Sequence, residues 1–107
     1  MINTGITIKL YAIDELTGTA RDYAIQHDGC SYFQSYDSLC SKYDGKTLTL
    51  GRDWDYSVTT MKYLQQWMQE ACYFLWKDAM AMGGKSGADS LRRAIAAGLI
   101  QYDENMR

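Results

Sequence analysis

The chain has 107 residues, which is enough for one hydrophobic core and too few for two, so we expect residues 1–107 to form a single domain. Hydrophobic residues make up 47% and charged residues 22%, with a formal net charge of −2, so there is no excess of basic charge typical of nucleic-acid-binding proteins. No apolar run approaches the roughly 18 residues of a membrane-spanning helix, and no signal-peptide pattern is present, which predicts a cytoplasmic protein without membrane contact.

Residues 5–13 alternate in polarity and predict a half-buried strand. We expect its apolar side to face the core and its other side to face solvent. The apolar side carries Ile6, Ile8, Leu10 and Ala12, and the other side carries Thr7, Lys9 and Tyr11.

A short helix is predicted next, after residues 14–17 and ending by Asp28. Thr17 can cap it, Ala20 and Ala24 are spaced by four, and Gly29 is a natural helix stop. Residues 30–38 give no clear pattern. They either extend the following strand backward or form an irregular connection that exposes tyrosines.

Asp44-Gly45 favours a two-residue type I′ turn between two strands. This turn pairs Tyr43 with Lys46, Ser41 with Leu48 and Leu39 with Leu50, and places Leu48 and Leu50 on the buried face. Cys40 and Lys42 fall on the other face. The second strand is expected to continue through residues 52–56, where Trp54 and Tyr56 cover a helix and Asp53 and Asp55 face solvent.

A long helix follows, with Ser57 among its candidate N-caps and an end near Gly83-Gly84. Its apolar stripe comprises Met61, Leu64, Met68, Ala71 and Leu75, widened by Trp67 and Phe74. A last helix, capped by Ser86 or Asp89, precedes a polar tail at residues 101–107. The predicted fold class is α+β, with a small antiparallel sheet (one strand and a β-hairpin) and two to three helices packed on one face.

Residues 83–86, Gly-Gly-Lys-Ser, contain the end of a P-loop pattern. A complete P-loop needs a glycine at position 79, where this chain has Ala79, and a buried strand before it, where a helix is predicted. A glycine linker is the better interpretation, and we expect no nucleotide cofactor.

Cys30, Cys40 and Cys72 are odd in number, widely spaced and without a CxxC pair. This pattern predicts reduced thiols, no disulfide and no metal site. A thiol enzyme would need His27, the single histidine, beside Cys30, and a surface histidine with a half-buried thiol is the simpler interpretation. We therefore expect no catalytic residues and no enzymatic activity.

Two stretches resemble small uncharacterised proteins of bacteriophages and mobile elements. The first runs Leu10-Tyr11-Ala12-Ile13-Asp14-Glu15-Leu16-Thr17 and is followed by Ala20, Ala24 and Ile25; the second runs from Trp54-Asp55-Tyr56-Ser57 through Val58-Thr59-Thr60-Met61 to Lys62-Tyr63-Leu64. Ile13 replaces a usual aromatic residue, Gly18 a usual helix former and Tyr63 a common histidine. The resemblance implies a phage or prophage origin and no established activity.

Nine tyrosines and three tryptophans, without matching basic charge, favour a protein-binding surface. The candidate binding residues are those without a clear inward assignment: Tyr32, Tyr36, Tyr73 and Trp76. We expect a non-enzymatic accessory protein that binds a host or phage protein, for example a host defence enzyme that it inhibits. The alternative is a nucleic-acid-binding module that uses tyrosines and Arg92-Arg93. The apolar end of the long helix also favours a homodimer.

Overall fold

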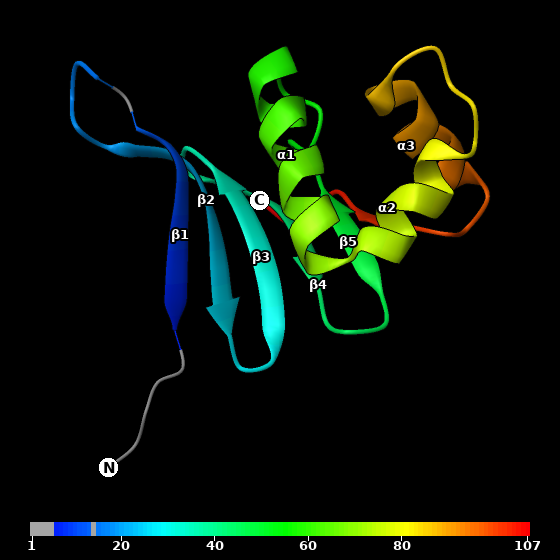
Figure 1. Cartoon of the computed structure of the whole chain (residues 1–107), viewed down its shortest axis with the longest axis horizontal. Helices are drawn as coiled ribbons and strands as arrows, with labels where there is room; N and C mark the ends of the chain where they lie inside the picture. Colours follow the sequence, from blue (N-terminus) through cyan, green and yellow to red (C-terminus); the bar gives the residue numbers. More distant parts are fainter. Residues whose placement is uncertain (1–5, 14) are drawn as a thin grey trace.

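The computed structural model describes residues 6–13 and 15–107, which form one six-stranded sheet with three helices on one of its faces (Figure 1). The fold class is α+β, as predicted, but the sheet is larger than expected and mixed. The elements are β1 (Thr7–Ile13), β2 (Ala20–His27), β3 (Cys30–Ser35), β4 (Ser38–Tyr43), β5 (Leu48–Gly51), α1 (Val58–Ala71), α2 (Tyr73–Met80), α3 (Gly87–Ala96) and β6 (Gln101–Asp103).

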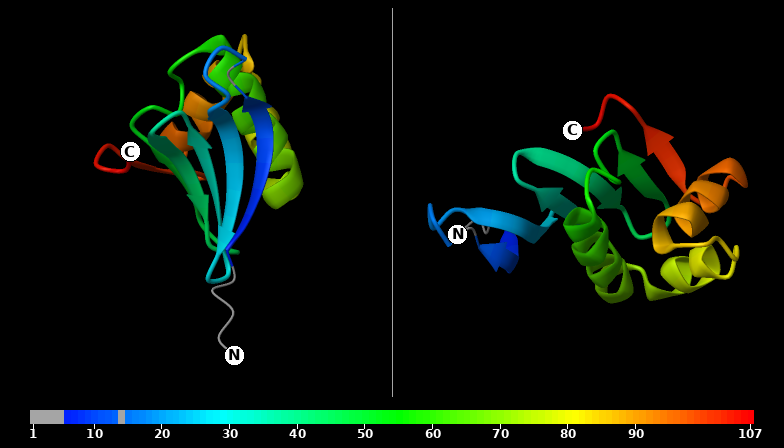
Figure 2. Two further views of the ribbon diagram at one scale, coloured as in Figure 1. Left: turned by 90° about the vertical axis from the view of Figure 1, so that its left-hand side faces the viewer. Right: turned by 90° about the horizontal axis from the view of Figure 1, so that it is seen from above.

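The six strands lie side by side in chain order. Strands β1 to β5 are antiparallel to their neighbours, and β6 pairs with β5 in parallel. Seen from above, the helices all lie on the same side of the sheet (Figure 2). Because α1, α2 and α3 intervene between β5 and β6, the chain can return to the same edge in the parallel direction.

The prediction of a helix that ends by Asp28 is wrong, because this segment forms β2. The spacing of Ala20 and Ala24 fits one helix turn but also fits a strand, where every second residue shares a face. Asp28 and Gly29 have φ angles of 57° and 78°, so they occupy the two left-handed positions of a type I′ hairpin turn. Gly29 therefore ends a hairpin turn and not a helix.

Residues 30–38, left unassigned from the sequence, contain β3, a turn at Tyr36 and Asp37, and the first residue of β4. The predicted start of the first strand at Gly5 lies outside the described residues, as does Asp14. The rest of that strand is confirmed as β1.

The hairpin around Asp44-Gly45 is confirmed, but the predicted two-residue type I′ turn and the register are wrong, because Asp44 does not have a positive φ angle and the loop has four residues. Tyr43 pairs with Leu48, and the Oδ1 atom of Asp44 accepts hydrogen bonds from the backbone N–H groups of Lys46 and Thr47 at 2.9 and 2.7 Å. This side-chain turn lengthens the loop by two residues. A shift of two keeps Leu48 and Leu50 on the buried face, as predicted. Leu39, predicted to share that face, instead pairs with Gln34 on the opposite face, beyond the irregularity in β4.

Strand β4 contains an irregularity that buries two consecutive residues. The pairing of β3 with β4 shifts between Phe33 and Gln34, and both Cys40 and Ser41 are fully buried. The expectation that Cys40 lies on the outer face is therefore wrong, because a bulge turns it inward.

Strand β5 ends at Gly51, and residues 52–56 form turns in place of the predicted strand. The N–H groups of Trp54 and Tyr56 bond the carbonyl groups of Gly51 and Asp53. Trp54 is buried as predicted, whereas Tyr56 is exposed. The two residues do not share a face because the chain turns here and does not continue as a strand.

Helix α1 starts as predicted: the Ser57 hydroxyl accepts a hydrogen bond of 3.0 Å from the Thr60 N–H. The predicted long helix is interrupted at Cys72, where φ −149° and ψ 60° leave the helical region, and α2 begins at Tyr73. The sequence carries no glycine or proline at this point. Helix α3 starts at the predicted Ser86 cap, and the predicted polar tail contains β6.

The core lies between the sheet and the helices. Its fully buried larger side chains are Phe33, Leu48, Leu50, Leu64, Trp67, Met68, Leu91 and Ile100. None of the described helices is long and apolar enough to cross a membrane.

Candidate functional site

The edge strand β1 presents its aliphatic side chains to solvent, opposite to the orientation predicted from the sequence. Ile6, Ile8 and Leu10 are 53%, 56% and 50% exposed. Thr7, Lys9 and Tyr11 alternate with them on the side of α1. The predicted core-facing role of the three aliphatic residues is therefore wrong.

Contacts with α1 explain this orientation. Lys9 Nζ lies 2.8 Å from Glu70 Oε1, and the Tyr11 hydroxyl donates a hydrogen bond of 2.7 Å to Glu70 Oε2. The Tyr11 ring stacks on Tyr63 and packs against Phe33, with centroid distances of 6.0 and 6.1 Å. Long side chains with apolar bodies and polar tips thus fill the helix side of β1.

The register of the strands extends this apolar surface across the sheet. One cross-strand row on the face away from the helices runs Ile8, Ile25, Tyr32, Lys42, Thr49 and Gln101, and the adjacent row runs Leu10, Tyr23, Gln34 and Leu39. We call these two rows, together with Ile6, the open sheet face. Its apolar side chains concentrate on β1 to β3, and neither row contains a carboxylate.

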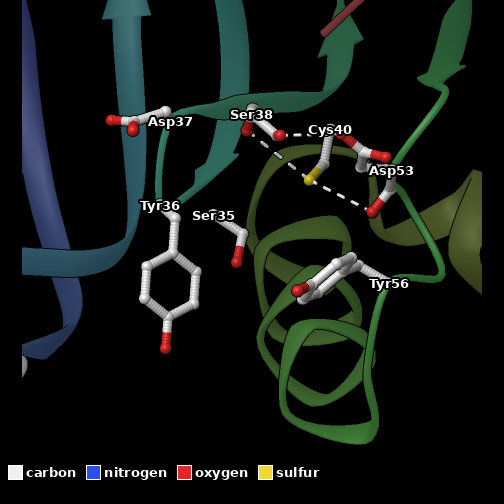
Figure 3. Close-up of a pocket in the computed structure, with 7 residues that line it drawn as sticks. All are labelled: Ser35, Tyr36, Asp37, Ser38, Cys40, Asp53 and Tyr56. Carbon is white, nitrogen blue, oxygen red and sulfur yellow. Dashed lines mark hydrogen bonds between the residues drawn. The ribbon is translucent and has the colours of Figure 1, made fainter.

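A pocket of about 370 Å³ lies on the side of the sheet opposite the open sheet face, between the β3–β4 turn and the segment that leads into α1. Its lining residues are Ser35, Tyr36, Asp37, Ser38, Cys40, Asp53 and Tyr56, and we call it the tyrosine pocket (Figure 3). Tyr36 and Tyr56 project to the same side, with Ser35 between them, whereas Asp37 points away.

The polar groups of the tyrosine pocket are held in place. The Ser38 hydroxyl donates a hydrogen bond of 2.7 Å to Asp53 Oδ2, and the Cys40 thiol lies 3.6 Å from the carbonyl oxygens of Ser38 and Asp53. The Ser35 hydroxyl lies 3.2 Å from that of Thr60 in α1. Asp53 is therefore oriented by a neighbour but keeps carboxylate lone pairs free for a ligand.

Tyr36 adopts a backbone conformation that is unusual for its residue type. Its φ angle of 53° lies in the left-handed region, which costs a residue with a Cβ atom about 1–2 kcal/mol. Two hydrogen bonds support it: its N–H bonds the Arg21 carbonyl, and its carbonyl accepts from Gln34 Nε2 at 2.9 Å. Strain of this kind is concentrated at functional sites.

One buried acid lies beside the pocket. Asp22 pairs with Ser35 across β2 and β3 and is almost fully buried. Its Oδ2 atom lies 3.3 Å from Arg21 Nε, and among the described residues its Oδ1 atom has no hydrogen-bond partner.

The structure does not bring the four predicted binding residues together. Tyr32 lies on the open sheet face, with Lys42 Nζ 5.9 Å from its ring centre, and Tyr36 borders the tyrosine pocket. Tyr73 and Trp76 pack against each other on α2, at 5.7 Å, and Trp76 is tied to α1 by a hydrogen bond to Gln65. Sequence reasoning missed Tyr56 and Asp53 because it placed them on a continuous strand.

The arginines considered for nucleic-acid binding are engaged within the protein. Arg92 lies 2.9 Å from Asp55 and over the Trp54 ring, and Arg93 donates to the backbone carbonyls of Met82 and Gly83. The Gly-Lys-Ser segment lies directly before α3, and Ser86 is the N-cap of that helix. Ser86 accepts from the Asp89 N–H, and the Lys85 N–H bonds Asp89 Oδ2.

The three cysteines are free thiols, two of them well buried. Burial raises the pKa of both Cys40 and Cys72 to about 12. His27 and Cys30 are cross-strand partners beside the β2–β3 turn. Within the described part of the chain, no group of three or more His, Cys, Asp or Glu side chains could hold a metal ion.

Comparison with known proteins gives one match. No curated protein and no solved structure matched the chain significantly. A model of a family of unknown function, DUF8033, matches residues 8–78, which include most of β1, all of β2 to β5, α1 and most of α2. This match covers well over half of the 107 residues. The chain therefore belongs to the family of unknown function DUF8033.

Proposed function

We propose that this protein is a small, non-enzymatic accessory protein of a phage or mobile element that binds a host or phage protein in the cytoplasm of the host cell. The observation that carries this proposal is the outward orientation of Ile6, Ile8 and Leu10 on an edge strand. The two sequence stretches that resemble phage proteins support the origin. Inhibition of a host defence enzyme is one concrete form of the activity.

The open sheet face has the composition of a binding surface. Adjacent aliphatic and aromatic side chains on β1 to β3 form a contiguous apolar area, and such areas on a protein surface mark interaction sites. Tyr23 and Tyr32 add large contact areas that lose little side-chain entropy on binding. The two cross-strand rows of this surface are also held in place, because all their residues belong to paired strands.

The edge of β1 offers a second mode of contact. Strand β1 is at the end of the sheet, has no proline or acidic residue, and has its one lysine paired with Glu70. Natural edge strands are usually protected by charge, proline or a bulge near the exposed edge. The pairing of β1 with β2 is irregular between Leu10 and Ile13, so the regular part of the edge, residues 7–10, is the part that suits a partner that adds a strand and covers the apolar face.

Charge defines the partner further. Lys42 is the one charged residue in the two cross-strand rows of the open sheet face, among the residues that the structure describes. A partner with an apolar surface and an acidic group opposite Lys42 is therefore complementary. A second copy of the same face would place two lysines in a shared interface.

Binding of single-stranded nucleic acid is the alternative. Tyr23, Tyr32 and Lys42 on an open sheet could stack bases and contact a phosphate. One lysine supplies little electrostatic attraction, and Arg92 and Arg93 are engaged elsewhere. These contacts favour the protein partner.

Affinity capture from a bacterial host lysate, before and after nuclease treatment, tests the proposal. The double variant Ile8→Ser, Leu10→Ser removes apolar contacts of the open sheet face, and Val58→Ser, Phe74→Ser removes two exposed apolar side chains of the helices as a matched control. We expect a protein retained after nuclease by the wild type and the control and lost by the open-face variant. Recovery of nucleic acid alone, sensitive to salt, would favour the alternative.

A further inference from the structure

We propose that the tyrosine pocket binds an organic cation, namely a guanidinium or alkylammonium group with its carbon stem, between Tyr36 and Tyr56 and with Asp53 as its counter-ion. This inference does not depend on the proposed function of the open sheet face. The pocket is formed by different residues, from the β3–β4 turn and the segment before α1.

The two tyrosines present exposed aromatic rings at the pocket. Tyr36 is 53% exposed and Tyr56 is 73% exposed. Among the described residues, neither ring packs against another aromatic ring and neither hydroxyl makes a hydrogen bond. Exposed aromatic faces on either side of a cavity attract a cation through their π systems, and this is how proteins recognise alkylated ammonium groups.

The charge of the pocket selects a cation over an anion. Asp53 and Asp37 are among its lining residues, and no lysine or arginine lines it. Arg21 and Tyr36 both line a neighbouring pocket, and Arg21 is paired with Asp22. The N-terminus of α1 carries a partial positive charge, but the Ser57 hydroxyl caps its Thr60 N–H, and the full carboxylate charge of Asp53 outweighs a half charge.

The arrangement of Asp53 fits a hydrogen-bonding cation in particular. One carboxylate oxygen accepts from Ser38, which fixes the group beside Ser38 and Cys40 (Figure 3), and the carboxylate retains acceptor sites for N–H donors. Cys40 and Ser35 are buried and supply a compact inner wall for a carbon stem. The cavity of about 370 Å³ accommodates one such group.

The strained turn gives the pocket its shape. The left-handed backbone of Tyr36 directs its ring to the same side as Tyr56 (Figure 3). A glycine or asparagine would adopt this conformation at lower cost, so the tyrosine ring at this position is consistent with a role in binding.

NMR titration of the whole chain with N-acetyl-arginine methylamide, and separately with spermidine, tests this inference. N-acetyl-citrulline methylamide is the uncharged control of nearly the same shape. We expect the arginine derivative to shift the ring signals of Tyr36 and Tyr56, with at least tenfold weaker binding of the citrulline derivative. Binding of spermidine in addition would identify a free polyamine as a competent ligand, whereas binding of the arginine derivative alone would identify a peptide side chain.

Variants separate the contributions of the walls and the carboxylate. Asp53→Asn keeps an acceptor for Ser38 but removes the charge, and Tyr56→Ala removes one wall, so both should abolish the shifts, whereas Tyr56→Phe should retain them. Tyr102→Ala, at an exposed tyrosine on β6, and Ile8→Ser, on the open sheet face, should leave binding unchanged. Equal binding of the citrulline derivative, or no shift at either tyrosine at millimolar ligand, would overturn the inference.

Discussion

Tyr11 on the edge strand donates a hydrogen bond of 2.7 Å to Glu70 near the end of α1. The same carboxylate accepts from Lys9 at 2.8 Å, so one acid at the end of a helix holds two alternate residues of β1. Because alternate residues share a face, these contacts direct Ile6, Ile8 and Leu10 to the opposite face. The proposed binding surface is a direct consequence of this anchor.

The anchor should make stability depend on pH. Partial burial alone would raise the pKa of Glu70, but the hydrogen bonds from Lys9 and Tyr11 and the charge of Lys9 outweigh it, and the pKa is lowered from 4.5. A carboxyl group with a lowered pKa stabilises the fold above its unfolded pKa, and this contribution is lost as the pH falls through the folded pKa. We expect Glu70→Gln to be less stable than the wild type at neutral pH and equal to it in strong acid.

Urea unfolding of the wild type and Glu70→Gln across the acid range measures this difference. Tyr11→Phe, which removes one donor and keeps the ring, should lower the free energy of unfolding by about 0.5–1 kcal/mol, because the carboxylate is partly solvated. A difference between the wild type and Glu70→Gln that does not change with pH would contradict the anchor.

The orientation of β1 gives a second prediction. Ile8→Ser and Leu10→Ser should each change the free energy of unfolding by less than about 0.5 kcal/mol, as is usual for exposed positions. Phe33→Ala, at a fully buried position of β3, should cost about 3–5 kcal/mol. If Ile8→Ser cost as much as a core substitution, thermal or urea unfolding would reveal it, and the aliphatic side of β1 would be buried.

The sequence predicted β1 as a strand but not the direction of its faces. Alternation of apolar and other residues is the same whichever side is buried, and the usual rule buries the aliphatic side. Here Lys9 and Tyr11 contact a complementary acid and two aromatic rings on α1 and β3, and that match depends on contacts between residues far apart in the sequence. No local pattern contains this information.

A third prediction concerns thiol reactivity. Burial raises the pKa of Cys40 and Cys72 to about 12, so at neutral pH almost none of either thiol is in the reactive thiolate form. Cys30 is less buried. Iodoacetamide treatment of the folded protein, followed by peptide mass spectrometry, should label Cys30 first, and labelling of Cys40 and Cys72 should rise only on unfolding or at strongly alkaline pH. Labelling of Cys40 ahead of Cys30 in the folded protein would contradict its burial.

The β2–β3 turn gives a fourth prediction. Gly29 has a φ angle of 78°, which disfavours any residue with a Cβ atom, so Gly29→Ala should destabilise the fold by about 1–2 kcal/mol although its Cβ atom would contact nothing. Asp28→Asn at the neighbouring left-handed position should be nearly neutral, because asparagine tolerates this region. A neutral Gly29→Ala in thermal unfolding would contradict the type I′ turn.

The same turn shows why β2 was predicted as a helix. Asp-Gly occurs at residues 28–29 and again at 44–45, but we predicted a hairpin at the second pair only. Alanines four residues apart fit both the period of about 3.6 residues of an α-helix and the period of two of a β-strand. Gly29 likewise fits both the end of a helix and a turn. The N-caps of α1 and α3, by contrast, are local: Ser57 and Ser86 each accept a hydrogen bond from the backbone N–H group three residues later. The sequence therefore identified both caps.

The candidate site was predictable only in part. Exposed tyrosines indicated a binding surface, and Tyr32 and Tyr36 are each part of a surface described above. Tyr56 and Asp53 line the same pocket as Tyr36 only because the chain turns after Gly51. The alternating pattern of a predicted strand does not indicate such a turn. Tyr73 and Trp76 lie apart from both surfaces, because the helix breaks at Cys72 without a sequence signal.

Site-specific photo-crosslinking in host lysate tests the central claim most directly. The photoreactive residue p-benzoylphenylalanine would replace Tyr32, on the open sheet face, or Tyr73, on α2, which compares two predicted binding positions in one experiment. We predict a protein crosslink of defined mass from position 32, lost in the background of Ile8→Ser, Leu10→Ser, and none from position 73. A specific crosslink from position 73 alone would contradict binding through the open sheet face.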